Sequence, residues 1–248
     1  MRAVVAVGRR HLPHGWSDLG LQVAIWLGFG LAYQVVRGFA DRDPTQAFSN
    51  AIKVIDFEQR AAGLYELTAQ NVLHSSDVIA KLAAWTYWNS EFTVISATLL
   101  FVYTRRHAAF KRFRNAILAT NLIGLVGYVL LPTAPPRMFP SYGFADPLTT
   151  HESGLIQLAA NPYAAMPSLH AADALVVGLM MAWVCRATWA KVLWSIWPVW
   201  VWFTVMATAN HYWLDVIGGA LVALVGLGLA VRYDHRSDRR LRVAEAAA

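Results

Sequence analysis

Residues 192–231 read VLWSIWPVWVWFTVMATANHYWLDVIGGALVALVGLGLAV, two apolar runs separated by a short polar break. A helix needs about 20 mostly apolar residues to cross the hydrocarbon core of a bilayer. The runs 192–207 and 212–231 approach or reach that length, so the stretch predicts two consecutive membrane spans. His211 and Asp215 lie at the start of the second run, where ionisable side chains are costly and usually functional.

The composition of the whole chain is that of a membrane protein. Of its 248 residues, 57% are hydrophobic and 15% are charged, whereas about 25% of a typical soluble domain is charged. A soluble all-α enzyme would need polar faces to cover its apolar helices, and this sequence offers too few. We therefore predict an all-α, polytopic membrane protein that forms a single domain over residues 1–248. Its six transmembrane helices are predicted at roughly 19–39, 83–103, 115–131, 169–185, 192–207 and 212–231.

The positive charges indicate how these spans are oriented. Loops on the cytoplasmic side of a membrane are usually enriched in lysine and arginine. With six spans and the N-terminus inside, most of the 21 lysines and arginines fall on the inside. The sequence thus predicts a multi-pass protein of the plasma membrane with both termini cytoplasmic. Because the basic residues flank the membrane and do not form one patch, no binding of nucleic acid is expected.

Two long loops are predicted on the outside. The first, about 40–82, is amphipathic and predicts one or two helices that lie on the membrane surface. The second, about 132–168, is rich in proline, glycine and aromatic residues, and a long loop of this kind is usually functional. The predicted apolar side of the first loop holds Ala51, Ile52, Ile55 and Leu64, and its polar side holds Lys53, Asp56, Glu58 and Arg60.

The most informative pair for chemistry is His211 and Asp215. Residues four apart share a face of a helix, so the Asp215 carboxylate can accept a hydrogen bond from one imidazole nitrogen. The other nitrogen then keeps a lone pair, as in a nucleophile or base that is oriented by an acid. Two alternatives stay open. The pair could bind zinc together with His170, or Asp215 could serve only as a local cap or partner within its helix.

A second group of candidate residues precedes and begins the fourth span. In Pro167-Ser168-Leu169-His170, Ser168 is a typical helix cap, and a helix start offers backbone N–H groups to an anion. His170 can give a proton to a leaving oxygen. Arg137 follows two prolines in the second outside loop and can bind a phosphate in bidentate fashion. The alternative is an arginine that faces lipid headgroups at the membrane interface.

Four acidic residues near these motifs have less specific roles. Asp173 follows His170 by three positions, so it either orients that histidine or is a packed polar residue. The other three, Glu58, Glu91 and Asp146, lie on the predicted outer side, where they could position a polar headgroup. The single cysteine of the chain excludes an intramolecular disulfide and a cysteine-based metal cluster.

Together these motifs resemble the type 2 phosphatidic acid phosphatase superfamily, from roughly Phe48 to Val231, and within it the branch that includes fungal inositol phosphorylceramide synthase. The likeness is strongest at 132–137, at 161–170 and at 210–219. The resemblance implies that His211 attacks phosphorus to form a phosphohistidine, that Asp215 orients it and that His170 protonates the leaving group. The phosphate-binding residues are then expected to be Arg137, Ser168 with its surrounding backbone, Tyr163 and Asn210.

The chain departs from the pattern of that superfamily at several positions. Leu169 stands where glycine is usual, and Thr204-Val205 stand where Ser-Arg is usual. The first motif, a lysine seven residues before Arg-Pro, is not present in that form. Two of the usual phosphate-binding cations are therefore unaccounted for, and Arg137 is the expected substitute.

The expected function is that of an integral membrane lipid-phosphate phosphatase, which hydrolyses a phosphoester of an amphipathic lipid at the extracytoplasmic face through a phosphohistidine. One alternative is a phosphotransferase that moves a phospho-headgroup, such as inositol phosphate, between lipids. Another is a non-catalytic lipid-binding or transport protein. The expected partners are a lipid phosphate or phospholipid and the bilayer, and no metal or other cofactor is expected. The sequence does not specify the lipid tail, the headgroup, the acceptor or the oligomeric state.

Overall fold

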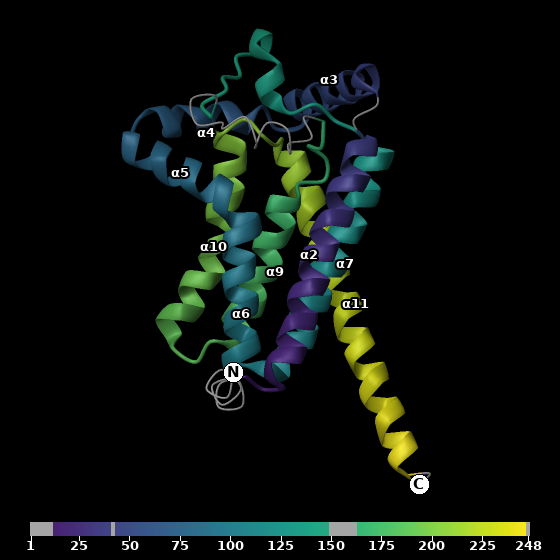
Figure 1. Ribbon diagram of the computed structural model, residues 1–248. Helices are drawn as coiled ribbons and strands as arrows, with labels where there is room; N and C mark the ends of the chain where they lie inside the picture. The colour runs from purple at the N-terminus through teal and green to yellow at the C-terminus, as the bar shows by residue number, and fades with distance from the viewer. Residues whose placement is uncertain (1–11, 41–42, 149–162, 247–248) are drawn as a thin grey trace.

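The computed structural model describes residues 12–40, 43–148 and 163–246 (Figure 1). Within these ranges the chain is built from helices, and its only extended pairing is an isolated bridge between Thr133 and Ala164. Residues 149–162 of the second predicted loop lie outside the described ranges. The α-helices are α2 (Gly15–Ala40), α3 (Pro44–Ala61), α4 (Tyr65–His74), α5 (Asp77–Asn89), α6 (Ile95–Arg105), α7 (His107–Leu130), α9 (Leu169–Val184), α10 (Thr188–Ala207) and α11 (Trp213–Ala246).

Each of the six predicted spans coincides with helical structure. In the described part of the chain, α7, α10 and the section of α11 from Trp213 to His235 are long and apolar enough to cross a membrane, and α9 is a shorter apolar helix. The first predicted span corresponds to α2 and the second to α5 and α6. The all-α class is thus confirmed, and three of the described helices are long and apolar enough to cross a membrane. The number of six spans stays a prediction.

The second predicted span is a continuous helical rod with one irregular segment. Between α5 and α6 the residues Ser90–Val94 form a π-helix, η1. Such π segments hold one extra residue per turn and occur frequently at functional sites. This segment carries Glu91, which is the one charged residue within the predicted span 83–103.

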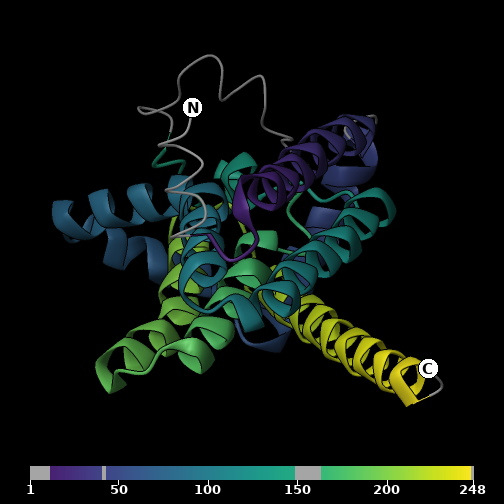
Figure 2. The same ribbon diagram turned by 60° about the horizontal axis from the view of Figure 1, so that its bottom comes forward.

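The helices run so that one end of the bundle is covered by α3 and α4. The starts of α9 and α11 lie beneath these two helices, and the junctions between α6 and α7 and between α9 and α10 lie at the opposite end (Figure 1). At that opposite end the Arg106 side chain donates a hydrogen bond to the carbonyl oxygen of Val184 (3.1 Å). Seen from this side, α11 extends beyond the other helices (Figure 2).

The first outside loop contains the helices that its sequence predicts, but two of its residues were assigned to the wrong side. Helix α3 begins with Asp43 as its cap and a proline at its first turn, a favourable combination for a helix start. Glu58, expected on the polar side, is completely buried, whereas Ile52, expected on the apolar side, is 41% exposed. The reason is that the Glu58 carboxylate receives a backbone N–H from the start of α11 (2.9 Å), so this acidic side chain faces the protein.

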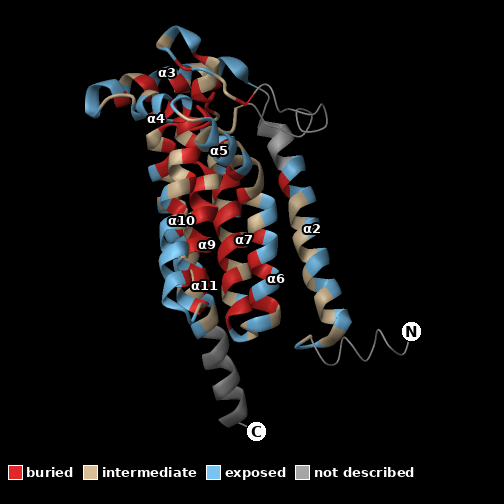
Figure 3. Cartoon of the chain, turned by 90° about the vertical axis from the view of Figure 1, so that its left-hand side faces the viewer, coloured by how far each residue is buried: buried red, intermediate tan, exposed pale blue. Residues whose placement is uncertain are grey.

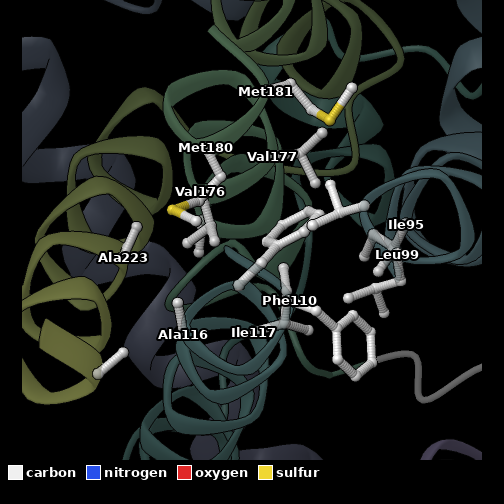
Figure 4. Packing of buried hydrophobic residues seen from close by; sticks show 14 of the residues in the cluster. Ile95, Leu99, Phe110, Ala116, Ile117, Val176, Val177, Met180, Met181 and Ala223 are labelled. Carbon is white, nitrogen blue, oxygen red and sulfur yellow. The ribbon is translucent and has the colours of Figure 1, made fainter. Parts of the chain in front are cut away.

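Helix α9 lies in the centre of the bundle. Most of its residues are buried, and buried residues gather on α9 and α7, whereas α2 is largely exposed or half-buried (Figure 3). Since hydrocarbon is as apolar as these side chains, close packing and polar contacts hold such helices together. Figure 4 shows the main cluster, which includes Ile95 and Leu99 of α6, Phe110 and Ile117 of α7, Val176, Val177 and Met180 of α9, and Ala223 of α11.

Glycines allow the backbones around the start of α9 to approach closely. A Cβ atom on Gly219 of α11 would overlap with the carbonyl oxygen of Ser168, and one on Gly127 of α7 would overlap with the ring of Pro167. Small residues at helix contacts are characteristic of membrane bundles. The segment that begins α9 is therefore held between α7 and α11.

We expect Gly219→Ala to destabilise the fold, because its methyl group would have to displace the backbone of Ser168. Overpacking of this kind costs about 1–3 kcal/mol. Gly228→Ala, in the same helix, is the matched control, because nothing lies within 4 Å of a Cβ there and alanine favours a helix by about 1 kcal/mol. Thermal unfolding of both variants in one detergent measures the difference. Equal unfolding temperatures would contradict the close contact.

Candidate active site

A small polar pocket lies where the starts of α9 and α11 meet. Its volume is about 50 Å³, and the rings of His170 and His211 face each other there at 5.8 Å between centroids. Four of the residues predicted from sequence thus come together in one wall. The lining residues are Tyr33, Tyr87, Glu91, Tyr128, Pro135, Arg137, Ala164, Ala165, His170, Asn210 and His211.

His211 is held in one tautomer by a backbone group. Its Nδ1 lies 2.8 Å from the carbonyl oxygen of Ala165. Because a carbonyl oxygen can only accept, Nδ1 must carry the hydrogen, and in the neutral ring Nε2 keeps the lone pair. Burial lowers the pKa of His211 to about 4, aided by the charge of Arg137 and opposed by the Ala165 hydrogen bond and by Glu91. The imidazole is therefore neutral near pH 7, as a nucleophile requires.

Asp215 lies beside His211 but is not its closest partner. Its Oδ2 is 3.5 Å from Nδ1 of His211 and accepts the backbone N–H of Tyr212 at 2.9 Å. Its carbonyl oxygen accepts the N–H of Ser168 at 3.0 Å. The predicted proximity is thus observed, but the hydrogen bond that sets the tautomer is the one that Nδ1 of His211 donates to the Ala165 carbonyl. Asp215 supplies a buried carboxylate next to the ring and joins α11 to the start of α9.

His170 lies in the first turn of α9, and Ser168 caps that helix as predicted, its hydroxyl accepting the N–H of Ala171 (3.2 Å). The imidazole stacks on Tyr87 with 4.7 Å between centroids. Its Nδ1 is 3.4 Å from a carboxylate oxygen of Glu91 in η1. The acidic partner of His170 is therefore Glu91, while Asp173, the partner considered from sequence, is bonded elsewhere.

Arg137 is fixed in place from two sides. Its backbone N–H donates to the carbonyl oxygen of Ala209 (2.9 Å), and its guanidinium donates to the amide oxygen of Asn210. Tyr87 donates to the same oxygen (3.0 Å), and the Asn210 amide hydrogens are directed to Thr208. Asn210 therefore orients Arg137 and Tyr87. Ala209 has a φ of 52°, a left-handed conformation that is uncommon outside glycine and clusters at functional sites.

Two predicted phosphate-binding side chains lie outside the pocket wall. Ser168 is completely buried as a helix cap, and Tyr163 packs against Phe48 at 6.1 Å between ring centroids. In turn, the pocket wall contains three tyrosines that were not predicted from the sequence, Tyr33, Tyr87 and Tyr128. It also contains Glu91, which was expected to position a headgroup. An ionisable residue inside a predicted span is a signal of function, and that rule alone would have singled out Glu91.

Three buried carboxylates meet at the first turn of α11. Glu58 accepts the N–H of Leu214 (2.9 Å), Glu66 accepts that of Trp213 (2.5 Å), and Asp215 accepts that of Tyr212. These N–H groups have no partner within their helix, and they attract negative charge. Burial raises the pKa of Glu58 to about 9 and that of Glu66 to about 7, and the neighbouring carboxylates add to both increases.

The three carboxylates of Glu58, Glu66 and Asp215 thus form a cap for the start of α11. In the part of the chain that the structure describes, no cluster of three or more His, Cys, Asp or Glu side chains is arranged to hold a metal ion. The pocket itself offers one guanidinium, two imidazoles and phenol groups. Such a set can bind an anion, attack it and transfer a proton.

Comparison with known proteins relates this arrangement to lipid enzymes. Residues 52–229 match the family model described as the PAP2 superfamily. Phosphoinositol dihydroceramide synthase of Bacteroides thetaiotaomicron is 33% identical over 146 residues, which are 52% of this chain and 48% of that protein. Inositol phosphorylceramide synthase of Candida albicans is 24% identical over 187 residues, 65% of this chain and 38% of that protein. The chain thus spans about half or less of these relatives.

A solved structure has a related fold. The crystal structure of LpxE of Aquifex aeolicus superposes with a TM-score of 0.50 at 13% identity, over 76% of this chain and 99% of that one. At this level of identity the likeness concerns the fold alone.

We expect the stability of the protein to fall as the pH rises from about 5 towards 9. The folded state keeps the proton of Glu58 up to about pH 9, whereas the unfolded carboxyl loses it near its ordinary pKa of 4.5, so the unfolded state binds fewer protons in this range. Glu58→Gln keeps an acceptor for Leu214 without the titration and should flatten the dependence. Asp56→Asn, an exposed change on the same helix, is the control. Unfolding temperatures across the pH range provide the measurement, and an unchanged slope in Glu58→Gln would contradict this role.

Proposed function

The chain belongs to the PAP2 superfamily, and from this premise we propose that it is a membrane enzyme that cleaves a phosphoester of an amphipathic lipid. The observation that carries the proposal is the hydrogen bond from Nδ1 of His211 to the Ala165 carbonyl (2.8 Å). It leaves Nε2 of a buried, neutral imidazole as the nucleophilic atom, in a pocket that also holds His170 and Arg137.

In the first step Nε2 of His211 attacks phosphorus while Arg137 binds the non-bridging oxygens. A P–N bond forms and the P–O bond to the lipid alcohol breaks. His170 gives its proton to the departing oxygen, so the alcohol leaves neutral. The phosphorylated imidazole gains positive charge, and the Asp215 carboxylate 3.5 Å away stabilises it, the role an acid plays beside a catalytic histidine.

In the second step a hydroxyl oxygen attacks phosphorus on the side that the alcohol has left. His170, now neutral, takes the proton of that hydroxyl, the P–N bond breaks, and His211 returns to its original state. Glu91, 3.4 Å from Nδ1 of His170, holds this imidazole in position in both steps. Charge at phosphorus is balanced by Arg137, which is itself oriented by Asn210.

The incoming hydroxyl distinguishes two functions. With water the enzyme is a lipid-phosphate phosphatase, the function expected from sequence. With a lipid alcohol it is a phosphotransferase that moves a phospho-headgroup between lipids. The second candidate is favoured by the two curated relatives, a phosphoinositol dihydroceramide synthase and an inositol phosphorylceramide synthase.

We further propose that six spans cross the plasma membrane, with the pocket extracytoplasmic and both termini cytoplasmic. The support is the distribution of charge. The helix ends at the α6–α7 and α9–α10 junctions, opposite the pocket (Figure 1), carry Arg105, Arg106, Lys111, Arg112, Arg114, Arg186 and Lys191. Cytoplasmic flanks are typically rich in such residues.

The decisive test combines product analysis with a trap for the intermediate. Purified wild type, His211→Ala and the exposed-site control His74→Ala receive a panel of lipid phosphates and phospholipids, with and without lipid alcohols. We expect His211→Ala to lose turnover by about a thousandfold or more, while His74→Ala stays active. Acid quenching with labelled substrate should destroy the protein-bound phosphate, and alkaline quenching should preserve it.

The products then assign the function. Phosphate release without an alcohol identifies a phosphatase, and a new phosphodiester that forms only with an alcohol identifies a transferase. Full activity of His211→Ala would overturn the mechanism. Lipid binding without turnover in either protein would indicate the non-catalytic alternative.

A further inference from the structure

A series of apolar cavities along α2 adjoins the polar pocket. Tyr33 and Glu91 line both the pocket and a neighbouring cavity of about 350 Å³, which lies between α2 and the η1–α6 segment. Trp26 in turn lines both that cavity and a third one of about 230 Å³, farther along α2 towards α6 and α7. We call this series of cavities, from Tyr33 past Trp26 to Leu19, the α2 groove.

The dimensions of the α2 groove match one hydrocarbon chain of a lipid. The 14 helical steps from Leu19 to Tyr33 span about 21 Å, and one leaflet contributes about 15 Å of hydrocarbon. Its walls are mainly apolar, with Trp26, Phe92, Ile95 and Leu99 among them. Among the residues of α2 whose burial the structure describes, only Tyr33 is buried. The groove is thus bounded by a helix that itself faces the surroundings of the bundle, as lateral entry from a bilayer requires.

The apolar wall of the groove contains one polar pair beside the pocket. Asp173 of α9 and Asn121 of α7 are buried and both line the groove. Asn121 directs its amide hydrogens to Asp173 (2.8 Å) and to the carbonyl oxygen of Ile117 (3.0 Å). The oxygens left to a ligand are therefore acceptors, which match a hydroxyl or an amide N–H. A buried carboxylate within an apolar helix is costly and usually has a ligand or partner.

We propose that the α2 groove binds the hydrocarbon chain of the lipid alcohol that leaves from, or attacks, phosphorus, and that Asp173 and Asn121 recognise a hydrogen-bond donor next to that alcohol. This inference rests on the proposed function. The groove meets the pocket at Glu91, the residue in contact with His170, hence on the side of the proton donor. In an in-line displacement the leaving and attacking oxygens both lie opposite Nε2 of His211. One groove therefore serves the alcohol in both steps.

The first experiment tests the groove without requiring turnover. A C16 alcohol with a diazirine in mid-chain is photo-crosslinked to the purified protein, and labelled peptides are identified by mass spectrometry. We expect labels on α2 and α6 in wild type and equally in His211→Ala. Gly30 lines the groove and Gly28 does not, and a Cβ at either position meets nothing within 4 Å. Gly30→Leu should weaken labelling about tenfold, the effect of displacing roughly two methylene groups, while Gly28→Leu should not.

Activity gives a second reading of the same variants. Gly30→Leu should raise KM about tenfold for a long-chain phosphoester and leave phenyl phosphate, which has no chain, unaffected. Labels elsewhere in the bundle, or equal effects of Gly30→Leu and Gly28→Leu, would overturn the proposal that the α2 groove binds the hydrocarbon chain. If labelling follows the groove but no lipid is turned over, the groove stands and the proposed function fails.

The polar pair is tested by competition between two alcohols that differ in one hydroxyl. In wild type, 1,2-hexadecanediol should displace the crosslinker at a concentration about tenfold lower than 1-hexadecanol, because one additional buried hydrogen bond is worth about that factor. In Asp173→Asn the difference should narrow. Equal displacement by both alcohols in wild type would overturn the proposal that Asp173 and Asn121 recognise a hydrogen-bond donor. This comparison uses only the wild-type protein, so it is valid even if Asp173→Asn does not fold.

Discussion

The contact between Gly219 and the backbone of Ser168 determines the geometry on which the rest of the site depends. It brings α11 against the first turn of α9, and the N–H of Ser168 then reaches the carbonyl oxygen of Asp215 at 3.0 Å. His170 lies in the first turn of α9, and His211 lies two residues before α11, so this contact also positions both imidazoles. The distance between the imidazoles is thus set by packed backbones and not by flexible side chains, which is the condition for precise placement of reacting groups.

The helices over the pocket belong to the same construction. Glu58 of α3 and Glu66 of α4 bind N–H groups at the start of α11, so two elements outside the apolar bundle hold the helix that follows His211. Burying carboxylates is costly unless they are protonated or well partnered. The raised pKa values of both groups reflect this cost, and the positive end of the helix dipole offsets part of it.

The sequence predicted the helices and the main pocket residues because these depend on local patterns. Apolar runs predicted the positions of the helices. The four-residue spacing of His211 and Asp215 predicted that they lie together, although His211 precedes the first residue of α11. The Ala165 carbonyl could not be predicted, since a backbone group has no signature in the residue type. The contact between Glu91 and His170 could not be predicted either. The π-helix η1 contains an extra residue per turn, and this changes which side chains share a face with Glu91. Glu58 was misplaced because an amphipathic pattern assumes that the charged side meets water.

The polar pocket and the α2 groove share few residues, and this has a consequence for how the lipid preference of such a protein can change in evolution. Tyr33 is the only described residue of α2 in the pocket wall, and the remainder comes from α5, η1, α7, α9 and the segments that precede α9 and α11. Substitutions elsewhere along α2 would alter the groove without touching either histidine. An ancestral scaffold of this design could acquire a new preference for lipid chains by drift in a single peripheral helix, and its chemistry would be inherited unchanged.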